Sequence, residues 1–186
     1  MKKIILISSC LLSFSGYSFA DNINLVANDP IAAFHFKDNK HSNLDDKFIE
    51  KINKQSNLTV SERKKIVDVA KSMLKTRYVY GGKSTKGVDC SGLVSYVFTK
   101  IGFPLNGPAR DIAKQGTKIN KDKVMKGQLI AGDLLFFNTT GKPNSHVGIV
   151  INKDTFIHAS TSERKVVVAN LNSAYFKNKL EFAKRF

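Results

Sequence analysis

One cysteine and two histidines have the residue types and the setting for nucleophilic catalysis. Cys90 follows Asp89, a good helix N-cap residue, and stands where apolar residues begin to recur at helical spacing. Free N–H groups and the positive dipole end of a helix N-terminus stabilise an anion, so we expect a depressed pKa for the Cys90 thiol. The same N–H groups can donate to the oxyanion that forms when sulfur attacks a carbonyl carbon. The alternative is that Cys90 is merely a small buried residue.

The two histidines fall in neighbouring segments that have the composition of β-strands. His146 opens the stretch HVGIVI, and His158 lies near the end of the stretch TFIHAS. The three-residue connection 152–154 predicts a register in which Gly148 pairs with His158 and both imidazoles share one face of the sheet. The histidine Cβ atoms would then lie on the order of 7 Å apart. A lone strand histidine is usually structural, but this pair indicates a shared site.

Amphipathic helices are expected to position the cysteine. Thr59 and Glu62 fit a capping box, and the apolar stripe behind them predicts a helix over residues 60–75. The helix that begins at Cys90 is predicted to end before Gly102. A turn and a short helix should follow up to about Gly116, and residues 117–131 are predicted to be a strand or a loop.

The second half of the chain changes to β-favouring runs. The predicted strands are 134–137, 147–151, 155–159, 165–169 and 181–186. Helices followed by consecutive strands are typical of an α+β fold. We therefore predict a nucleophilic cysteine at a helix N-terminus, packed on an antiparallel sheet of about five to six strands.

The first 20 residues have the features of a secretory signal peptide. Two lysines precede a short apolar stretch, which ends in an A-x-A-like cleavage site at Ala20. Residues 21–58 would then be a linker with one short helix near 42–52. An alternative is a lipoprotein box that ends at Cys10, which would leave a lipidated N-terminus. No stable membrane span is predicted, because the apolar stretch is too short.

Export would affect both the cysteine count and the interpretation of charge. Cys90 would be the only cysteine of the mature chain in an oxidising compartment, which favours a catalytic role. The formal charge of +15 would then indicate contact with anionic envelope polymers, with a solvated basic surface as the alternative. No basic run with interleaved aromatic residues supports nucleic-acid recognition.

Five sequence blocks, in order, resemble the NlpC-type (NlpC/P60) family of bacterial cell-wall cysteine peptidases. The blocks are Tyr78-x-Tyr80-Gly81-Gly82, Gly87-x-Asp89-Cys90-Ser91-Gly92-Leu93-Val94, Ala131-Gly132-Asp133-Leu134 with Phe136-Phe137, His146-Val147-Gly148-Ile149, and Phe156-Ile157-His158-Ala159-Ser160. The similarity runs from about Arg77 to the C-terminus. The chain departs from the family pattern at 105–110, where the family has Leu-Pro-Arg, so the role of Arg110 is left open.

The resemblance implies a papain-like core, formed here by residues 59–186, and a Cys-His-His triad. Cys90 corresponds to the nucleophile, His146 to the base, and His158 to the residue that orients the base. Tyr78 corresponds to a tyrosine near the oxyanion. The flanking Asp89 and Ser91 correspond to residues that contact the polar end of the peptide, with N-capping as the alternative role of Asp89.

The resemblance also implies a function. Similar proteins hydrolyse amide bonds in peptidoglycan stem peptides through a thioester, so we expect a cysteine endopeptidase that needs no cofactor. It would act as a monomer in the periplasm or cell envelope. The cleaved bond would be either the γ-D-glutamyl–diaminopimelate bond or the D-alanyl–diaminopimelate cross-link. Alternatives are an amidase or acyltransferase, a non-catalytic wall-binding module, and a zinc site made of the triad residues, against which the long ligand spacings argue.

Overall fold

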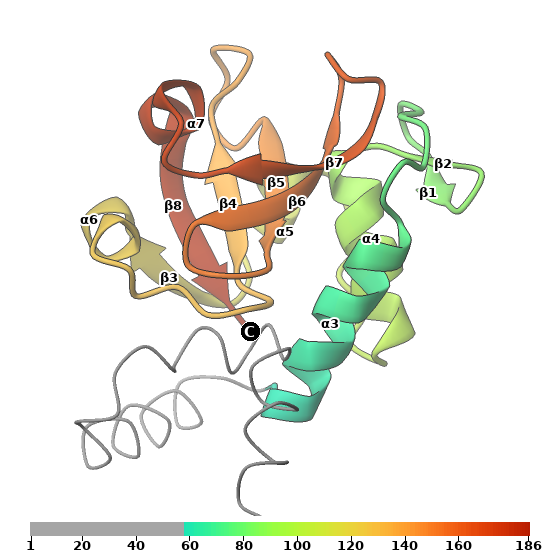
Figure 1. Ribbon diagram of the computed structural model, residues 1–186, viewed down its shortest axis with the longest axis horizontal. Coiled ribbons are helices and arrows are strands. Elements are labelled where there is room, and N and C mark those ends of the chain that lie inside the picture. The colour runs from blue at the N-terminus through green and yellow to red at the C-terminus, as the bar shows by residue number, and fades with distance from the viewer. Residues whose placement is uncertain (1–57) are drawn as a thin grey trace, which may run out of the picture.

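The computed structural model describes residues 58–186, which form helices packed on a six-stranded antiparallel sheet (Figure 1). The strands are β3 (Thr117–Asn120), β4 (Leu134–Phe137), β5 (His146–Val150), β6 (Thr155–Ser160), β7 (Lys165–Asn170) and β8 (Leu180–Arg185), in the order β3-β8-β4-β5-β6-β7. The predicted α+β class and strand number are confirmed. The expected signal peptide, the Cys10 alternative and the helix near 42–52 lie outside the described residues.

The first helix of the described region, α3 (Val60–Ser72), begins where the capping box predicts. The Thr59 hydroxyl accepts from the Glu62 N–H, and the Glu62 carboxylate accepts from the Thr59 N–H at 2.7 Å. Ile66, Val67 and Ala70 are completely buried on one side of the helix. The reciprocal cap and the buried stripe together fix the position of α3 against the rest of the core.

The cysteine helix, α4 (Cys90–Lys100), packs against β5 and β6. Its apolar stripe of Leu93, Val94, Val97 and Phe98 has no solvent exposure. Next to its first turn lies a two-stranded hairpin of β1 (Lys83–Ser84) and β2 (Gly87–Val88). The helix therefore holds its N-terminal residue, Cys90, between this hairpin and the central strands.

Helices cover both faces of the sheet (Figure 1). On the α3 and α4 side, the short α5 (Ala109–Ile112) follows the predicted turn. The opposite face carries α6 (Lys121–Met125) and α7 (Ala174–Lys179), two helices that the sequence did not predict. A second apolar cluster lies on that side and includes Phe137, Phe156 and, partly buried on α7, Phe176. The sheet is thus packed on both faces.

A buried charged cluster ties α3 to the C-terminal strand. Asp133, with no solvent exposure, accepts two bonds from the Arg185 guanidinium, at 3.0 and 2.6 Å. Its Oδ1 also lies 3.5 Å from Arg63 Nη1, and Arg63 donates to the carbonyl of Phe186 at 2.6 Å. Burial lowers the pKa of Arg63, although the neighbouring Asp133 charge opposes this shift. The cluster fixes the C-terminal strand to the first core helix.

Within residues 58–186, no helix has the length and apolar character needed to span a membrane.

Candidate active site

Cys90 is the first residue of α4 and is partly buried at the end of β5. Backbone N–H groups of Val147, Ser91 and Cys90 itself act on the thiol and lower its pKa, although burial has the larger effect. Val147 directly follows His146 in β5, so the thiol lies near the strand that carries the predicted base. Pairing between β5 and β6 is confined to Ile149 and Val150 and does not reach this end of the strands.

Asp89 organises the first turn of α4. Its Oδ1 accepts from the Gly92 N–H at 2.6 Å and from the Ser91 hydroxyl at 3.1 Å, and its Oδ2 accepts from the Gly81 N–H at 2.8 Å. The carboxylate therefore caps the helix and also holds the glycine-rich loop, which confirms the N-capping role. Gly92 is required here, because a Cβ at this position would overlap the carbonyl oxygen of Gly82.

The two imidazoles are in direct contact. Nε2 of His146 lies 2.9 Å from Nδ1 of His158, and the rings are perpendicular. The pairs Ile149–Ile157 and Val150–Phe156 are in the predicted register. A Cβ at position 148 would lie 2.5 Å from the Phe156 ring, so glycine is required there. Because residue 148 has no Cβ, the Phe156 ring can pack against the imidazole of His158.

The contact between the histidines restricts their tautomers. For His146 to accept a proton at Nδ1, its Nε2 must carry the hydrogen and donate it to Nδ1 of His158. His158 then carries its own hydrogen on Nε2. This arrangement leaves Nδ1 of His146 as the nitrogen that can accept the thiol proton, as a Cys-His-His triad requires.

Aromatic rings surround the histidine pair. The Phe137 ring lies 6.1 Å from that of His146, and the rings of Phe156 and Phe176 lie 5.2 and 5.3 Å from that of His158. Burial lowers the pKa of His146 to about 3, with a further contribution from the His158 charge, and burial lowers the pKa of His158 to about 4. Both imidazoles are therefore neutral at pH 7.

The prediction of a depressed thiol pKa is wrong for this geometry. Burial raises the pKa of Cys90, and the Asp89 carboxylate raises it further. Hydrogen bonds from the N–H groups of Val147, Ser91 and Cys90 act in the opposite direction but are smaller contributions. The helix N-terminus is present as predicted, but desolvation outweighs it. The Cys90 thiol and both imidazoles are therefore neutral in the resting protein.

Tyr78 lies within electrostatic range of Cys90. Its pKa is raised by burial first and then by the negative charges that Cys90 and Asp89 carry when ionised. The phenol therefore stays protonated and keeps its hydrogen-bond donor. Its backbone is held by a bridge to Val88 and by a 2.8 Å bond from its N–H to the carbonyl of Arg164.

Arg110 is exposed on the first turn of α5, and Asp111 has its own partner in Lys114. The sequence reasoning missed Phe176, which packs on His158 from a helix only 6 residues long. The N-cap Ser173 was the available signal for this helix. Among the described residues, the triad included, no group of three or more His, Cys, Asp or Glu side chains is placed to hold a metal ion.

Comparisons with known proteins agree with this geometry. A family model described as the NlpC/P60 family matches residues 75–185, a range that contains all six predicted site residues. The probable endopeptidase NlpC of Escherichia coli K12 is 41% identical over 113 residues, which are 59% of this chain and 69% of that protein. The murein DD-endopeptidase MepS/murein LD-carboxypeptidase of the same organism is 35% identical over 126 residues, 68% of this chain and 64% of that protein.

A solved structure shows the same fold. The NlpC/p60 domain of the peptidoglycan hydrolase SagA superposes with a TM-score of 0.56 at 33% sequence identity, and covers 67% of this chain and 98% of that domain. The likeness confirms the predicted papain-like fold.

Proposed function

The chain belongs to the NlpC/P60 family, and we propose that it is a cysteine peptidase that hydrolyses amide bonds in peptidoglycan stem peptides. The observation that carries this proposal is the 2.9 Å contact between His158 and His146, which begins β5, the strand against which the Cys90 helix packs. Relatives named as a murein DD-endopeptidase and a peptidoglycan endopeptidase support the substrate class.

The reaction begins from the neutral pair. As the substrate carbonyl approaches the sulfur, the Cys90 proton moves to Nδ1 of His146 and the thiolate attacks the carbonyl carbon. The imidazolium that forms is stabilised on one side by the new negative charge and on the other by Nδ1 of His158. The ion pair therefore forms during the reaction and is not present in the resting enzyme.

The oxyanion of the tetrahedral intermediate needs donors in fixed positions. The backbone N–H of Cys90 stands at the start of α4, and the phenol of Tyr78 keeps its proton nearby. We assign these two groups to the oxyanion, because donors that are held in place before the reaction stabilise developing charge most effectively. Ser91 is oriented by its bond to Asp89 and remains available for the polar end of the peptide.

The intermediate breaks down when His146 Nδ1 returns its proton to the leaving amine. The C–N bond breaks and a thioester to Cys90 remains. Water then attacks the thioester, with its proton taken by His146, and the regenerated thiol and a free carboxylic acid complete the cycle. Every step uses the same nitrogen, which the contact with His158 keeps free for proton transfer.

Two bonds are candidates, the γ-D-glutamyl–diaminopimelate bond and the D-alanyl–diaminopimelate cross-link. Digestion of purified muropeptides followed by mass spectrometry of the products tests the proposal and separates them, because the new carboxyl group falls on glutamate or on alanine. Transfer of the acyl group to an added amine would indicate an acyltransferase. Capture of muropeptides without cleavage would indicate a binding module.

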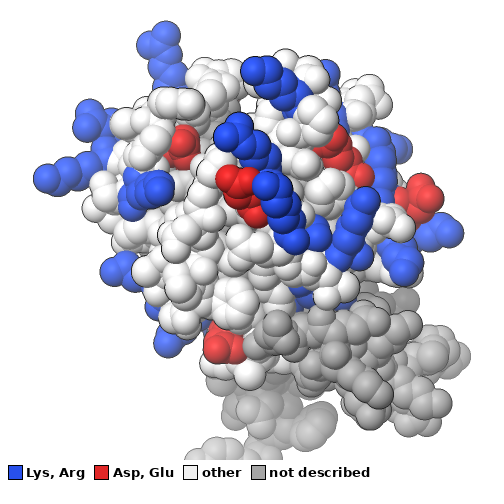
Figure 2. Space-filling model, turned by 180° about the vertical axis from the view of Figure 1, so that it is seen from behind, with Lys and Arg blue, Asp and Glu red and all other residues white. Residues whose placement is uncertain are grey.

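The proposed location is the cell envelope, where a monomer would meet its polymer substrate. Lysine and arginine side chains extend over much of the surface in Figure 2, with few acidic groups among them. This distribution supports contact with anionic envelope polymers. Salt-dependent co-sedimentation of the protein with purified sacculi tests this part of the proposal, since ionic contacts weaken as salt screens them.

A further inference from the structure

A pocket of about 700 Å³ lies beside the histidine pair, on the face of the sheet that carries α7. Both His146 and His158 line it, whereas Cys90 and Tyr78 do not. The pocket is therefore on the imidazole side of the reaction centre, away from the nucleophile and the oxyanion donors. None of the proton transfers proposed for Cys90 and His146 needs this pocket.

The strand register builds the pocket. Ser160 pairs directly with Lys165, and His158 pairs with Val167, so β6 and β7 present these side chains to the same face. The turn after Ser160 forms one rim, with the Ser160 hydroxyl accepting the N–H of Glu163 at 3.1 Å. On another side stands α7, whose Tyr175 is 54% exposed although it lines the pocket.

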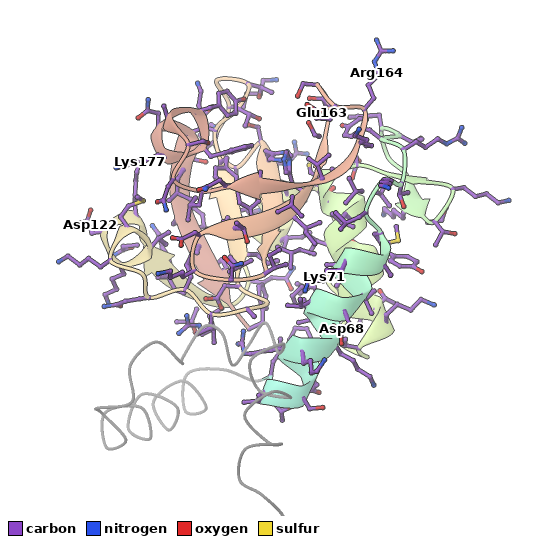
Figure 3. The ribbon with its side chains drawn as sticks, viewed as in Figure 1. Asp68, Lys71, Asp122, Glu163, Arg164 and Lys177 are labelled. Carbon is purple, nitrogen blue, oxygen red and sulfur yellow. The ribbon has the colours of Figure 1, made fainter. Side chains whose placement is uncertain are left out.

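The rim carries one cation and one anion. Lys165 Nζ lies 4.0 Å from Glu163 Oε2, and both side chains line the pocket while about half of each remains exposed. Arg164, between them in the sequence, does not line the pocket, and Figure 3 shows its side chain extending away from the molecule. Lys165 is the one basic side chain and Glu163 the one acidic side chain among the residues that line the pocket, apart from its two histidines.

A ligand that carries an ammonium and a carboxylate on the same carbon matches this pair. In the proposed mechanism the leaving amine takes its proton from His146, which lines the pocket, so the leaving fragment is expected on the imidazole side. In both candidate bonds the leaving amine belongs to diaminopimelate, whose second α-amino acid centre can be free. The charged pair and the leaving fragment therefore meet at the same place.

We infer that the pocket binds the free α-amino acid centre of the diaminopimelate leaving group, with its carboxylate at Lys165 and its ammonium at Glu163. This inference rests on the proposed function. When the D-alanyl cross-link is cut, the second centre of diaminopimelate is the one whose amine is bound to glutamate, so it has no free ammonium. The inference therefore favours the γ-D-glutamyl–diaminopimelate bond, in stems whose second amine is not cross-linked.

The test compares three synthetic stem peptides that end in diaminopimelate. One has a free second centre, one has that carboxylate amidated, and one has that amine acetylated. Because the contacts are partly exposed, we expect either modification to raise KM about threefold to tenfold with little change in kcat. Lys165→Gln should erase the discrimination against the amide, and Glu163→Gln should erase that against the acetylated amine.

Arg164→Gln is the matched control, since it removes a charge from the same turn and should keep both preferences. Equal KM values for the three peptides with wild-type protein would overturn the inference and leave the proposed function standing. If Arg164→Gln also lost the discrimination against the amidated and acetylated peptides, the inference would be overturned. The discrimination would then depend on the overall charge of the turn and not on Lys165 and Glu163. Failure to cleave any of the three would count against the proposed function instead.

A binding measurement tests the pocket without turnover. Free diaminopimelate, added at millimolar concentrations to isotope-labelled Cys90→Ala protein, should shift the amide signals of Ser160 and Lys165 more than those of α3. Lys165→Gln in the same background should abolish these shifts. Their absence in the parent protein, or their persistence in the Lys165 variant, would contradict the assignment.

Discussion

His146 Nε2 and His158 Nδ1 lie 2.9 Å apart, and in the proposed mechanism this contact decides which nitrogen takes part in the reaction. One of the two atoms must donate, and the hydrogen must be on His146 if its Nδ1 is to accept the thiol proton. His158 thus acts through His146. Aromatic rings pack around the pair, and burial lowers both pKa values enough to keep the imidazoles neutral at rest.

Substitutions of His158 should separate its hydrogen-bonding role from its bulk. We expect His158→Leu to lower kcat by about 10²- to 10⁴-fold with little change in KM, because the tautomer of His146 is no longer fixed. His158→Asn should retain more activity, since its amide oxygen can accept from Nε2 of His146. Steady-state kinetics on a muropeptide measures both. Equal kcat values for His158→Leu and wild type would contradict the assigned role.

The ionisation of Cys90 can be followed by its alkylation rate. Burial and the Asp89 charge raise the pKa of the thiol, so the rate with iodoacetamide should still be rising above pH 8. Asp89→Asn should lower this pKa, because it removes the negative charge and keeps an acceptor for the Gly92 N–H. A wild-type rate that is already constant at pH 6 would show that a thiolate is present at rest.

The histidine pair should also make the fold sensitive to acid. Their pKa values of about 3 and about 4 lie below the unfolded value of about 6.5, so the unfolded chain binds protons that the folded chain does not. The stabilisation is complete above pH 6.5 and is lost as the pH falls, with each histidine contributing a slope of about 1.4 kcal/mol per pH unit. Urea unfolding at pH 7, 6 and 5 measures this slope.

The control for acid sensitivity is the double variant His146→Gln/His158→Gln, whose unfolding free energy should change less between pH 7 and pH 5. An identical slope in wild type and double variant would mean that other groups cause the effect.

Asp133 should be a major determinant of stability. Asp133→Asn removes the buried carboxylate that both Arg63 and Arg185 contact, and we expect a loss of about 3–5 kcal/mol in unfolding free energy. Asp68→Asn is the control, because Asp68 is an exposed partner of Lys64 on α3 (Figure 3) and its loss should cost less than about 0.5 kcal/mol. Urea unfolding of the two variants compares them, and equal losses would contradict the role of Asp133.

The sequence predicted the parts of the site that depend on local pattern. The Thr59–Glu62 spacing located α3, and the apolar stripe after Asp89 placed Cys90 at a helix N-terminus. The parity of the 152–154 connection put both imidazoles on one face, because a strand has a fixed two-residue period. Each of these inferences needed only residues close together in the chain.

What the sequence could not predict depends on residues far apart. Asp133 and Arg63 are 70 positions apart, so no local pattern shows that both are buried. The shift of the thiol pKa depends on how completely the fold removes Cys90 from water, which spacing does not reveal. The helix that carries Phe176 is too short to show an apolar period.

The most direct test of the central claim compares wild-type protein with Cys90→Ala on purified muropeptides, with products identified by mass spectrometry. Because the sulfur forms the bond to the acyl group, we expect Cys90→Ala to lose at least about 10⁴-fold in kcat while its circular dichroism spectrum stays unchanged. The wild-type protein should release a new carboxyl group and the free amine of diaminopimelate. Undiminished release of the same products by Cys90→Ala would contradict the account.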